Sequence, residues 1–195
     1  MTRRRALQAG AAVLLVAGAG WAVSRGLDRL AGVQPDAEAP APAPEAASAA
    51  GVAHITATLF YGSADGQALV AVRREVPLAD GVVPQGRAIL MAQLQPAPEP
   101  HVSVIPDGTA LRAFYITDRG DGFVDLSGEA SSRHAGGSST ELLTVYAIVH
   151  AVTANLPSIR RVQILIDGRE ADTLAGHVDL RRPLEPNLSL VREAP

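Results

Sequence analysis

The sequence predicts an α/β domain, in the form of an α+β sandwich in which two helices pack on one face of a small mixed β-sheet. Short runs rich in β-branched and aromatic residues alternate with two longer segments of helical periodicity. Their order along the chain is β-β-α-β-β-α-β, followed by tail strands. Two amphipathic helices bury their apolar stripes most simply against one face of a shared sheet.

The first half of the domain is expected to be a hairpin followed by a helix. A strand is expected over 54–61 and its partner over 67–76, with a turn containing Gly and Asp between them. Pro84 fits the first position of the helix, because a helix leaves that backbone N–H unpaired anyway. The helix is expected to end before Pro96, since the residue before a proline disfavours the helical conformation.

The second half is expected to contain another hairpin. Strands over 111–116 and 123–126 flank the segment Asp118-Arg119-Gly120-Asp121-Gly122. Asp and Gly tolerate the left-handed backbone of a tight turn, so this segment is interpreted as the hairpin tip. A Ca²⁺ loop and an Arg-Gly-Asp adhesion signal are the alternatives, but the ligand spacing and closing Glu of an EF-hand are missing.

A longer helix follows the second hairpin. Ser138 and Glu141 match a capping box, in which each side chain pairs with a free amide of the first turn. Pro157 ends the helix, a strand is expected over 161–166, and a short extension over 174–180 completes the domain. The helix is predicted from one apolar stripe at helical spacing, made of Leu142, Val145, Tyr146, Val149 and Val152.

The composition excludes several classes of protein. The chain of 195 residues has a formal net charge of −3, which argues against general nucleic-acid binding, because phosphate contacts need a basic face. It contains no Cys. Disulfides, thiolate metal sites, a Cys nucleophile and a lipidated N-terminal cysteine are therefore excluded.

The N-terminal fifty residues predict a membrane anchor and a spacer. Residues 1–5 carry three Arg and are expected to be a cytoplasmic tail by the positive-inside rule. Residues 6–23 are almost wholly apolar and span roughly 27 Å as a helix, which is close to the thickness of a hydrocarbon core. Residues 24–51 are a Pro/Ala-rich linker of extended character, and 52–192 form the folded domain.

A cleaved signal peptide is the alternative for the same N-terminal segment. Small residues at Ala17, Ala19 and Ala22 offer A-x-A-like cleavage sites. The apolar run is longer than a usual signal-peptide core, which favours the uncleaved anchor with Trp21 near the outer interface. Both interpretations carry the domain out of the cytoplasm. The expected location is the inner (cytoplasmic) membrane, as a single-pass protein with its C-terminal domain in the periplasm.

The domain resembles the GerMN domain of sporulation and spore-germination proteins of the GerM type and of other bacterial envelope proteins. The resemblance covers about 55–183 and lies in the order and spacing of several short motifs rather than in any one of them. These motifs are Leu59-Phe60-Tyr61, Leu69 and Arg73-Arg74-Glu75-Val76, Pro106-Asp107-Gly108-Thr109-Ala110-Leu111, Val124-Asp125-Leu126-Ser127, Glu141 with Ile148-Val149, Val162-Gln163-Ile164-Leu165-Ile166-Asp167-Gly168, and Gly176-His177-Val178-Asp179.

The resemblance implies two helices on a small sheet, similar to the ring-building modules of secretion and sporulation assemblies. It also implies a role in interactions rather than catalysis, and it supplies no catalytic residues. Nothing in the sequence indicates sporulation, so that label does not transfer with the fold.

No catalytic, cofactor-binding or metal site is predicted. The five histidines lack the i, i+4 pairing of a helical metal site; they are His54, His101, His134, His150 and His177. His134 and Glu141 could converge across a Gly-Ser loop, but a surface histidine and a helix cap are the simpler interpretation. His177 and Asp179 are expected to share a local hydrogen bond rather than to form a catalytic pair.

The remaining candidates are serines and arginines. Ser131, Ser132, Ser138 and Ser139 are placed in loops, and none lies in the G-x-S-x-G elbow of a nucleophile. Three basic pairs could form a patch for an anionic partner, although solvated strand ends are the commoner arrangement; they are Arg73-Arg74, Arg160-Arg161 and Arg181-Arg182.

We therefore expect a membrane-anchored, extracytoplasmic, non-catalytic interaction or assembly module of the bacterial cell envelope, without cofactors. Its expected partners are envelope proteins, with self-association as a further option, and no nucleic acid. A peptidoglycan- or glycan-binding module is the alternative, although the chain has only 4% aromatic residues. A cell-wall hydrolase is the third hypothesis.

Overall fold

The computed structural model describes residues 53–192 of the chain. The expected cytoplasmic tail (1–5), anchor or signal peptide (6–23) and linker (24–51) lie outside the described residues, as does Trp21. Within the described part, no helix has both the length and the apolar character needed to cross a membrane.

The described residues contain two long helices and two sheets. The predicted order of strands and helices is confirmed, with a short helix added before the second long helix. The elements are β1 (His54–Gly62), β2 (Leu69–Pro77), α2 (Val82–Gln93), β3 (Leu111–Ile116), β4 (Asp121–Leu126), α3 (Glu129–Ser132), α4 (Ser138–Asn155), β5 (Arg161–Ile166), β6 (Arg169–Glu170), the 3₁₀ helix η1 (Leu188–Leu190) and β7 (Val191–Arg192).

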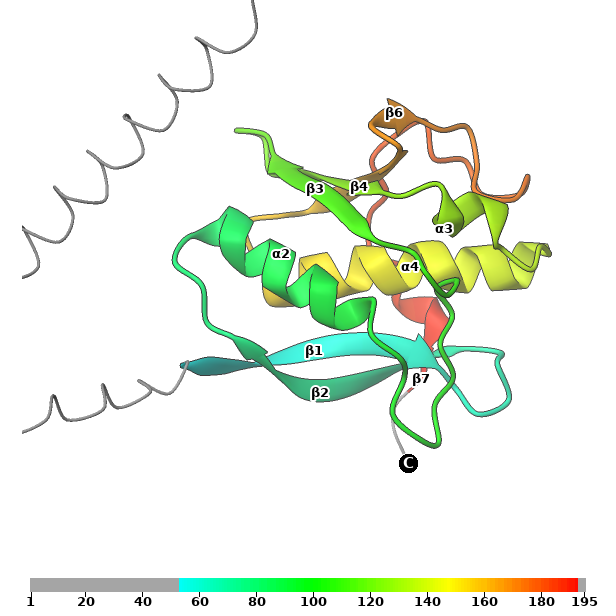
Figure 1. The fold of residues 1–195 in the computed structure, drawn as a ribbon, viewed down its shortest axis with the longest axis horizontal. Helices are drawn as coiled ribbons and strands as arrows, with labels where there is room; N and C mark the ends of the chain where they lie inside the picture. Colours follow the sequence, from blue (N-terminus) through cyan, green and yellow to red (C-terminus); the bar gives the residue numbers. More distant parts are fainter. Residues whose placement is uncertain (1–52, 193–195) are drawn as a thin grey trace, which may run out of the picture. The chain divides into compact units, whose positions relative to one another are not determined.

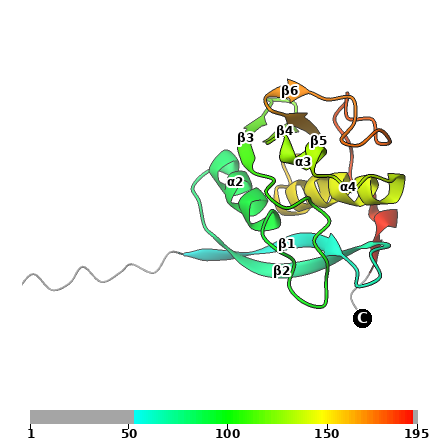
Figure 2. The same ribbon diagram turned by 45° about the vertical axis from the view of Figure 1, so that its right-hand side comes forward.

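The α+β class and the packing of two helices on a mixed sheet are confirmed. The strand order of the larger sheet is β3-β4-β5-β6, and β1, β2 and β7 form a second sheet instead of extending the first. Figures 1 and 2 show α2 and α4 lying between the hairpin β1–β2 and the larger sheet. The helices are therefore a middle layer, with strands on both sides.

The crossover from β4 to β5 explains why the larger sheet is mixed. β4 and β5 are parallel, whereas β3 pairs antiparallel with β4 and β6 antiparallel with β5. Parallel neighbours need a long connection, and α4 supplies it. The hairpin β3–β4 turns at Gly120, whose φ of 81° suits glycine. The predicted hairpin tip is therefore confirmed.

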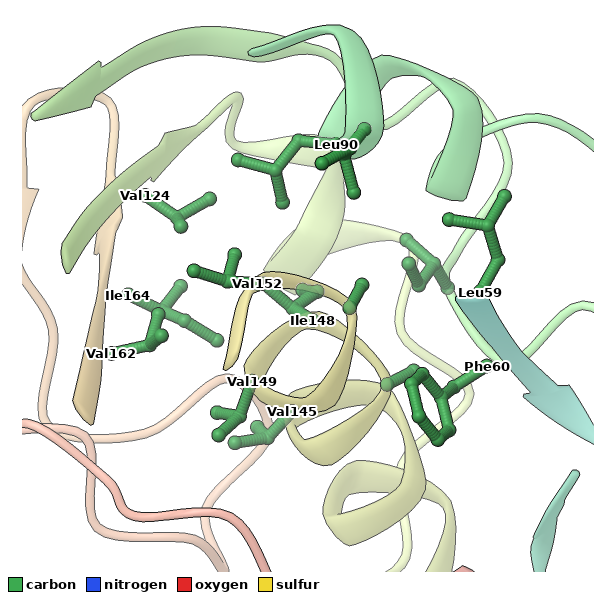
Figure 3. Close-up of a cluster of buried hydrophobic side chains, with 14 of the residues drawn as sticks. Leu59, Phe60, Leu90, Val124, Val145, Ile148, Val149, Val152, Val162 and Ile164 are labelled. Atoms are coloured by element: carbon green, nitrogen blue, oxygen red, sulfur yellow. The ribbon is translucent and has the colours of Figure 1, made fainter. Parts of the chain in front are cut away.

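The apolar surface of α4 is wider than the single predicted stripe. Val145, Val149 and Val152 are buried as expected, but Ile148 on another side of the helix is also fully buried. Figure 3 shows the side chains of α4 lying between Leu59 and Phe60 of β1 and Val162 and Ile164 of β5. A helix between two sheets must be apolar on most of its circumference, and α4 satisfies that condition.

A glycine allows the other long helix to approach the larger sheet closely. A Cβ placed on Gly86 of α2 would lie 2.2 Å from the ring of Phe114 on β3. Because real Cβ atoms do not approach so closely, any side chain here would push α2 away from β3. Gly86 therefore fixes the distance between the helix layer and the sheet.

Three local predictions need correction. α2 begins at Val82 rather than Pro84, which lies within the first turn, where a proline is still tolerated. The segment 174–180 contains no strand, and the tail strands are β6 and β7 instead. The predicted capping box of Ser138 and Glu141 does not form, since α4 has no side-chain cap.

Candidate functional site

Glu141 is a buried anchor rather than a helix cap. Its side chain is fully buried, and its Oε1 accepts hydrogen bonds from the amides of Leu174 (2.9 Å) and Ala175 (3.0 Å). Its Oε2 accepts from the backbone N–H (2.8 Å) and the Nδ1–H (3.1 Å) of His177. The carboxylate therefore ties a loop that lies more than thirty residues further along the chain to the N-terminal turn of α4.

The amides of this loop keep Glu141 ionised inside the protein. Burial alone would raise the pKa of the carboxyl, but the hydrogen bonds from the 174–178 backbone outweigh burial, and the pKa lies below its ordinary value. All of the bonding capacity is used within the chain, which leaves no face of the carboxylate for a substrate. Glu141 stabilises the fold and is not a general base.

His134 does not converge with Glu141. Its Nδ1 accepts from the N–H of Gly136 at 3.0 Å, so its Nε2 carries the proton and donates to Thr144 Oγ1 at 3.1 Å. The Thr144 hydroxyl in turn donates to the carbonyl of Val104. His134 therefore ties the loop before α4 to the helix and to the 102–105 segment.

The other expected histidine contacts also prove to be structural. His177 pairs with Glu141 and not with Asp179, whose carboxylate binds Arg181 instead. His150 is buried and donates its Nε2–H to the carbonyl of Asn187 at 3.0 Å. Over residues 53–192, no group of three or more His, Asp and Glu side chains could hold a metal ion.

The hairpin tip is stabilised by a bidentate ion pair. Asp121 accepts from Arg161 Nε at 2.9 Å and from Nη2 at 3.1 Å. Because this carboxylate binds the chain's own arginine, the geometry supports the structural interpretation over the adhesion and calcium alternatives.

A second charged cluster lies near the start of β3. The Nε of Arg112 lies 3.3 Å from the Asp125 carboxylate, and its Nη1 lies 3.5 Å from the Asp167 carboxylate. Asp125 also accepts from the N–H of Gly168 at 2.8 Å. The cluster carries two negative charges and one positive charge, so its net charge is −1.

The predicted serine and arginine candidates are dispersed. Ser131 and Ser132 lie in α3, and Ser138 and Ser139 begin α4, so the loop placement is wrong for all four. Ser131 donates to the carbonyl of Leu174. One arginine of each basic pair makes a local contact: Arg74 with the Tyr61 hydroxyl, Arg161 with Asp121, and Arg181 with Asp179.

One surface cavity of about 320 Å³ brings Ser63, Asp65 and His101 together. The Ser63 hydroxyl donates to Asp65, and no hydrogen bond joins His101 to either residue in the described part of the chain. The bonds from Ser63 and then Arg192 lower the pKa of Asp65 to about 2, so it is a poor proton acceptor. The three residues do not form a nucleophile activated by histidine.

Two side-chain amides that the sequence did not single out protect the edge of β1. The Gln93 carboxamide of α2 accepts from the N–H of Phe60 at 2.8 Å and donates to its C=O at 2.6 Å. Asn155 of α4 does the same for Thr58, at 2.8 and 2.7 Å. The next outward residue, Gly62, pairs with Val102 in both directions. Each amide takes the place of a neighbouring strand.

Exposed apolar side chains gather at the connection between β2 and α2. Leu78, Val82 and Val83 are 54%, 43% and 37% exposed, and we call them the apolar tip. Gln85 holds this connection by accepting from the N–H of Ala79 and donating to the carbonyl of Pro77. The tip is therefore displayed on a connection that α2 keeps in place.

Three comparisons place these features in context. The family model described as "Germane: Sporulation and spore germination" matches residues 58–172, which is more than half of the chain. No curated protein matches the chain.

Two solved structures are similar to this chain. The tandem GerMN domains of the sporulation protein GerM from Bacillus subtilis match with a TM-score of 0.54 and 17% identity, over 68% of this chain and 46% of that chain. A candidate lipoprotein from Clostridium perfringens matches with a TM-score of 0.49 and 27% identity, over 68% and 87%. At 17% identity, the likeness to the tandem domains establishes the fold alone.

Proposed function

This chain belongs to the Germane family of sporulation and spore germination domains, and we propose that its folded domain is a non-catalytic interaction module of the cell envelope. The fold agrees with the GerMN domains of a sporulation protein. Because one fold supports many activities, the proposal rests on what the side chains of this chain are free to do.

The observation that carries the proposal is that the polar interior is fully engaged in holding the chain together. Among the described residues, no buried side-chain nitrogen or oxygen lacks a hydrogen-bond partner. Glu141 binds a distant loop, Asp125 binds Arg112 and Gly168, and His150 binds Asn187. A catalytic acid or base needs a free face toward its substrate, and the carboxylates of Glu141 and Asp125 have both oxygens bound within the chain.

The apolar tip is the surface that we propose for contact with an envelope protein. Leu78 follows β2, Val82 and Val83 begin α2, and Gln85 fixes the backbone between them. An apolar patch that is already held in place loses little conformational entropy on binding. The glycan-binding alternative needs stacked aromatic rings, yet Tyr115 is the only exposed large aromatic side chain in residues 53–192.

We place the domain outside the cytoplasm, anchored in the inner membrane by residues 6–23. The support is the sequence pattern alone, in which three Arg precede an apolar run and a Pro/Ala-rich linker follows it. A linker of this kind would let the domain reach partners at some distance from the bilayer.

Capture of the tagged full-length chain from native membranes tests the proposal. We expect the wild-type chain to enrich envelope proteins, and the variant L78S/V83S to lose them. The matched control is Leu188→Ser, because Leu188 is 75% exposed but lies in η1 rather than in the tip. Failure of the wild-type chain to enrich any envelope protein would overturn the proposal, and equal losses in both variants would remove the tip from it.

A further inference from the structure

The outer edge of β3 is open, and its geometry can be derived from the register. Thr117 donates to the carbonyl of Asp121, so odd-numbered residues of β3 face β4 with their backbone groups. The N–H and C=O groups of Phe114 and Ile116 therefore point away from the sheet. No hydrogen bond within the described residues reaches these groups.

The side chains beside this edge form a partly exposed aromatic row. Tyr115 is 56% exposed and pairs with Phe123 of β4, which in turn pairs with Gln163 of β5. Phe114 points the other way and is buried against α2. The outer face of the sheet thus presents an aromatic ring next to unpaired backbone groups.

We infer that the β3 edge pairs with β3 of a second copy of this chain, antiparallel, with the two-fold axis at Tyr115. In this register Phe114 lies opposite Ile116 of the second copy, so the open backbone groups pair with each other. The two Tyr115 rings form a non-hydrogen-bonded cross-strand pair, the closer of the two kinds. The aromatic row then continues from Phe123 through both tyrosines into the second copy.

Charge complementarity favours a second copy as the occupant. The register brings the 117–120 turn of one copy beside the start of β3 of the other. That turn carries Asp118 and Arg119, and neither forms an ion pair within residues 53–192. In this register Asp118 lies opposite Arg112 of the second copy, and Arg119 approaches the same cluster of Arg112, Asp125 and Asp167, whose net charge is −1. By the two-fold symmetry this contact forms twice.

The uncovered part of the β2 edge is built against such pairing. β7 pairs only with Leu69 and Val70 of β2. The outward backbone groups of Ala71, Arg73 and Glu75 are therefore not paired with another strand. Exposed charges and a proline at the end of a strand, here Pro77, discourage edge-to-edge contact. The regular part of the β3 edge carries neither a charge nor a proline.

The absence of cysteine from the chain makes disulfide cross-linking a clean test. Tyr115→Cys in the full-length chain, oxidised in native membranes, is expected to give a species of twice the chain's mass. The two Cβ atoms would lie about 4.5–5.5 Å apart, which is close to disulfide geometry. Ala113→Cys alone is the matched control, because its two copies would be separated by roughly 13 Å along the strand.

The register has its own test. Ala113 lies opposite Thr117 of the second copy, so A113C and T117C chains should cross-link when they are coexpressed but not separately. Arg119→Glu, added to Y115C, should reduce the cross-linked fraction several-fold, since it places an acid beside the negative cluster. Arg133→Glu, a charge reversal outside the proposed interface, should leave that fraction unchanged.

Three results would overturn the inference. They are cross-linking of Y115C no greater than that of R73C on the β2 edge, equal cross-linking of Y115C and A113C, and an adduct of Y115C at a mass other than twice that of the chain. The inference deepens the proposed function by naming one partner. If self-pairing fails while the wild-type chain still captures envelope proteins, only the self-pairing is lost.

Discussion

β1 and β3 are both edge strands, but only the outer edge of β1 is occupied by the chain itself. Gln93 and Asn155 bind the backbone of Phe60 and Thr58, and Val102 pairs with Gly62. On β3, the outward groups of Phe114 and Ile116 have no partner within residues 53–192. The two edges therefore differ in whether the fold completes their hydrogen bonding.

The difference indicates where the chain uses polar groups for stability and where it leaves them for association. β1 lies against the helix layer, and a buried backbone group without a partner is costly, so helix side chains must supply one. On β3, no helix side chain reaches the outward groups of Phe114 and Ile116, so another strand can take that place. Substitutions on the two sides should therefore affect different measurements.

The largest expected effect is on the helix-layer side, at Glu141. Glu141→Ala leaves three amides and the His177 ring without an acceptor, and we expect a loss of about 3–4 kcal/mol in the free energy of unfolding. Chemical denaturation measures this loss. Glu185→Ala, at an exposed carboxylate, is the control and should change the value by less than about 0.5 kcal/mol.

The pH dependence of Glu141 sharpens the same prediction. Its pKa in the folded protein lies below the ordinary value of 4.5, so its contribution is complete above pH 4.5 and is lost as the pH falls through the folded pKa. Glu141→Gln should therefore flatten the fall in stability at acid pH. If the free energy of unfolding falls equally at acid pH in the wild type and in Glu141→Gln, the Glu141 carboxylate is not responsible for that fall.

Gln93 tests the protected edge itself. Gln93→Leu keeps the approximate volume but leaves the N–H and C=O of Phe60 unpaired in the interior, so we expect a loss of about 2–3 kcal/mol. Gln95→Leu, two residues further along and exposed, should change stability by less than about 0.5 kcal/mol. Equal effects of the two substitutions would mean that the carboxamide does not complete the β1 edge.

His150 gives a smaller effect near neutral pH. Burial lowers the pKa of His150, and the bond to Asn187 offsets this only in part. The unfolded chain therefore binds the proton first, and stability should fall as the pH drops below 6.5. His150→Phe keeps a ring beside Phe60 and should remove this component, whereas His54→Phe should retain it.

The smallest expected change in stability lies at the open edge. Tyr115→Ser removes an exposed ring, so the free energy of unfolding of the monomer should change by no more than about 0.5 kcal/mol. The same substitution should abolish association, as measured by sedimentation of the purified chain over a range of concentrations. If Tyr115→Ser lowered the free energy of unfolding of the monomer as much as Gln93→Leu does, the contrast between the β1 and β3 edges would be contradicted.

The sequence predicts local features better than distant contacts. β-branched runs, turn residues and helix periodicity predicted the strands, the hairpin tip and both long helices, because these depend on neighbouring residues. Glu141 was misread because Ser138 lies at capping distance, while the amides that it binds lie 33–36 positions away. Gln93 and Asn155 carried no local signal, since their partners are defined only when the helices meet β1.

The same limit explains the number of sheets and the extent of the helix core. One amphipathic stripe on α4 suggested one sheet, yet buried Ile148 and Ala151 show that the helix is covered on more than one side. From the sequence, such side chains could equally lie on a wide stripe facing a single sheet. Only the position of the hairpin β1–β2 against the helices decides between the two arrangements.

Amide hydrogen exchange of the chain, resolved residue by residue, tests the contrast between the edges most directly. The amides of Thr58 and Phe60 should exchange slowly at every protein concentration, because Asn155 and Gln93 hold them within each chain. Those of Phe114 and Ile116 should exchange rapidly in dilute solution and slow down as the concentration rises. Rapid exchange at Phe60, or protection of Phe114 and Ile116 that does not depend on concentration, would contradict the account.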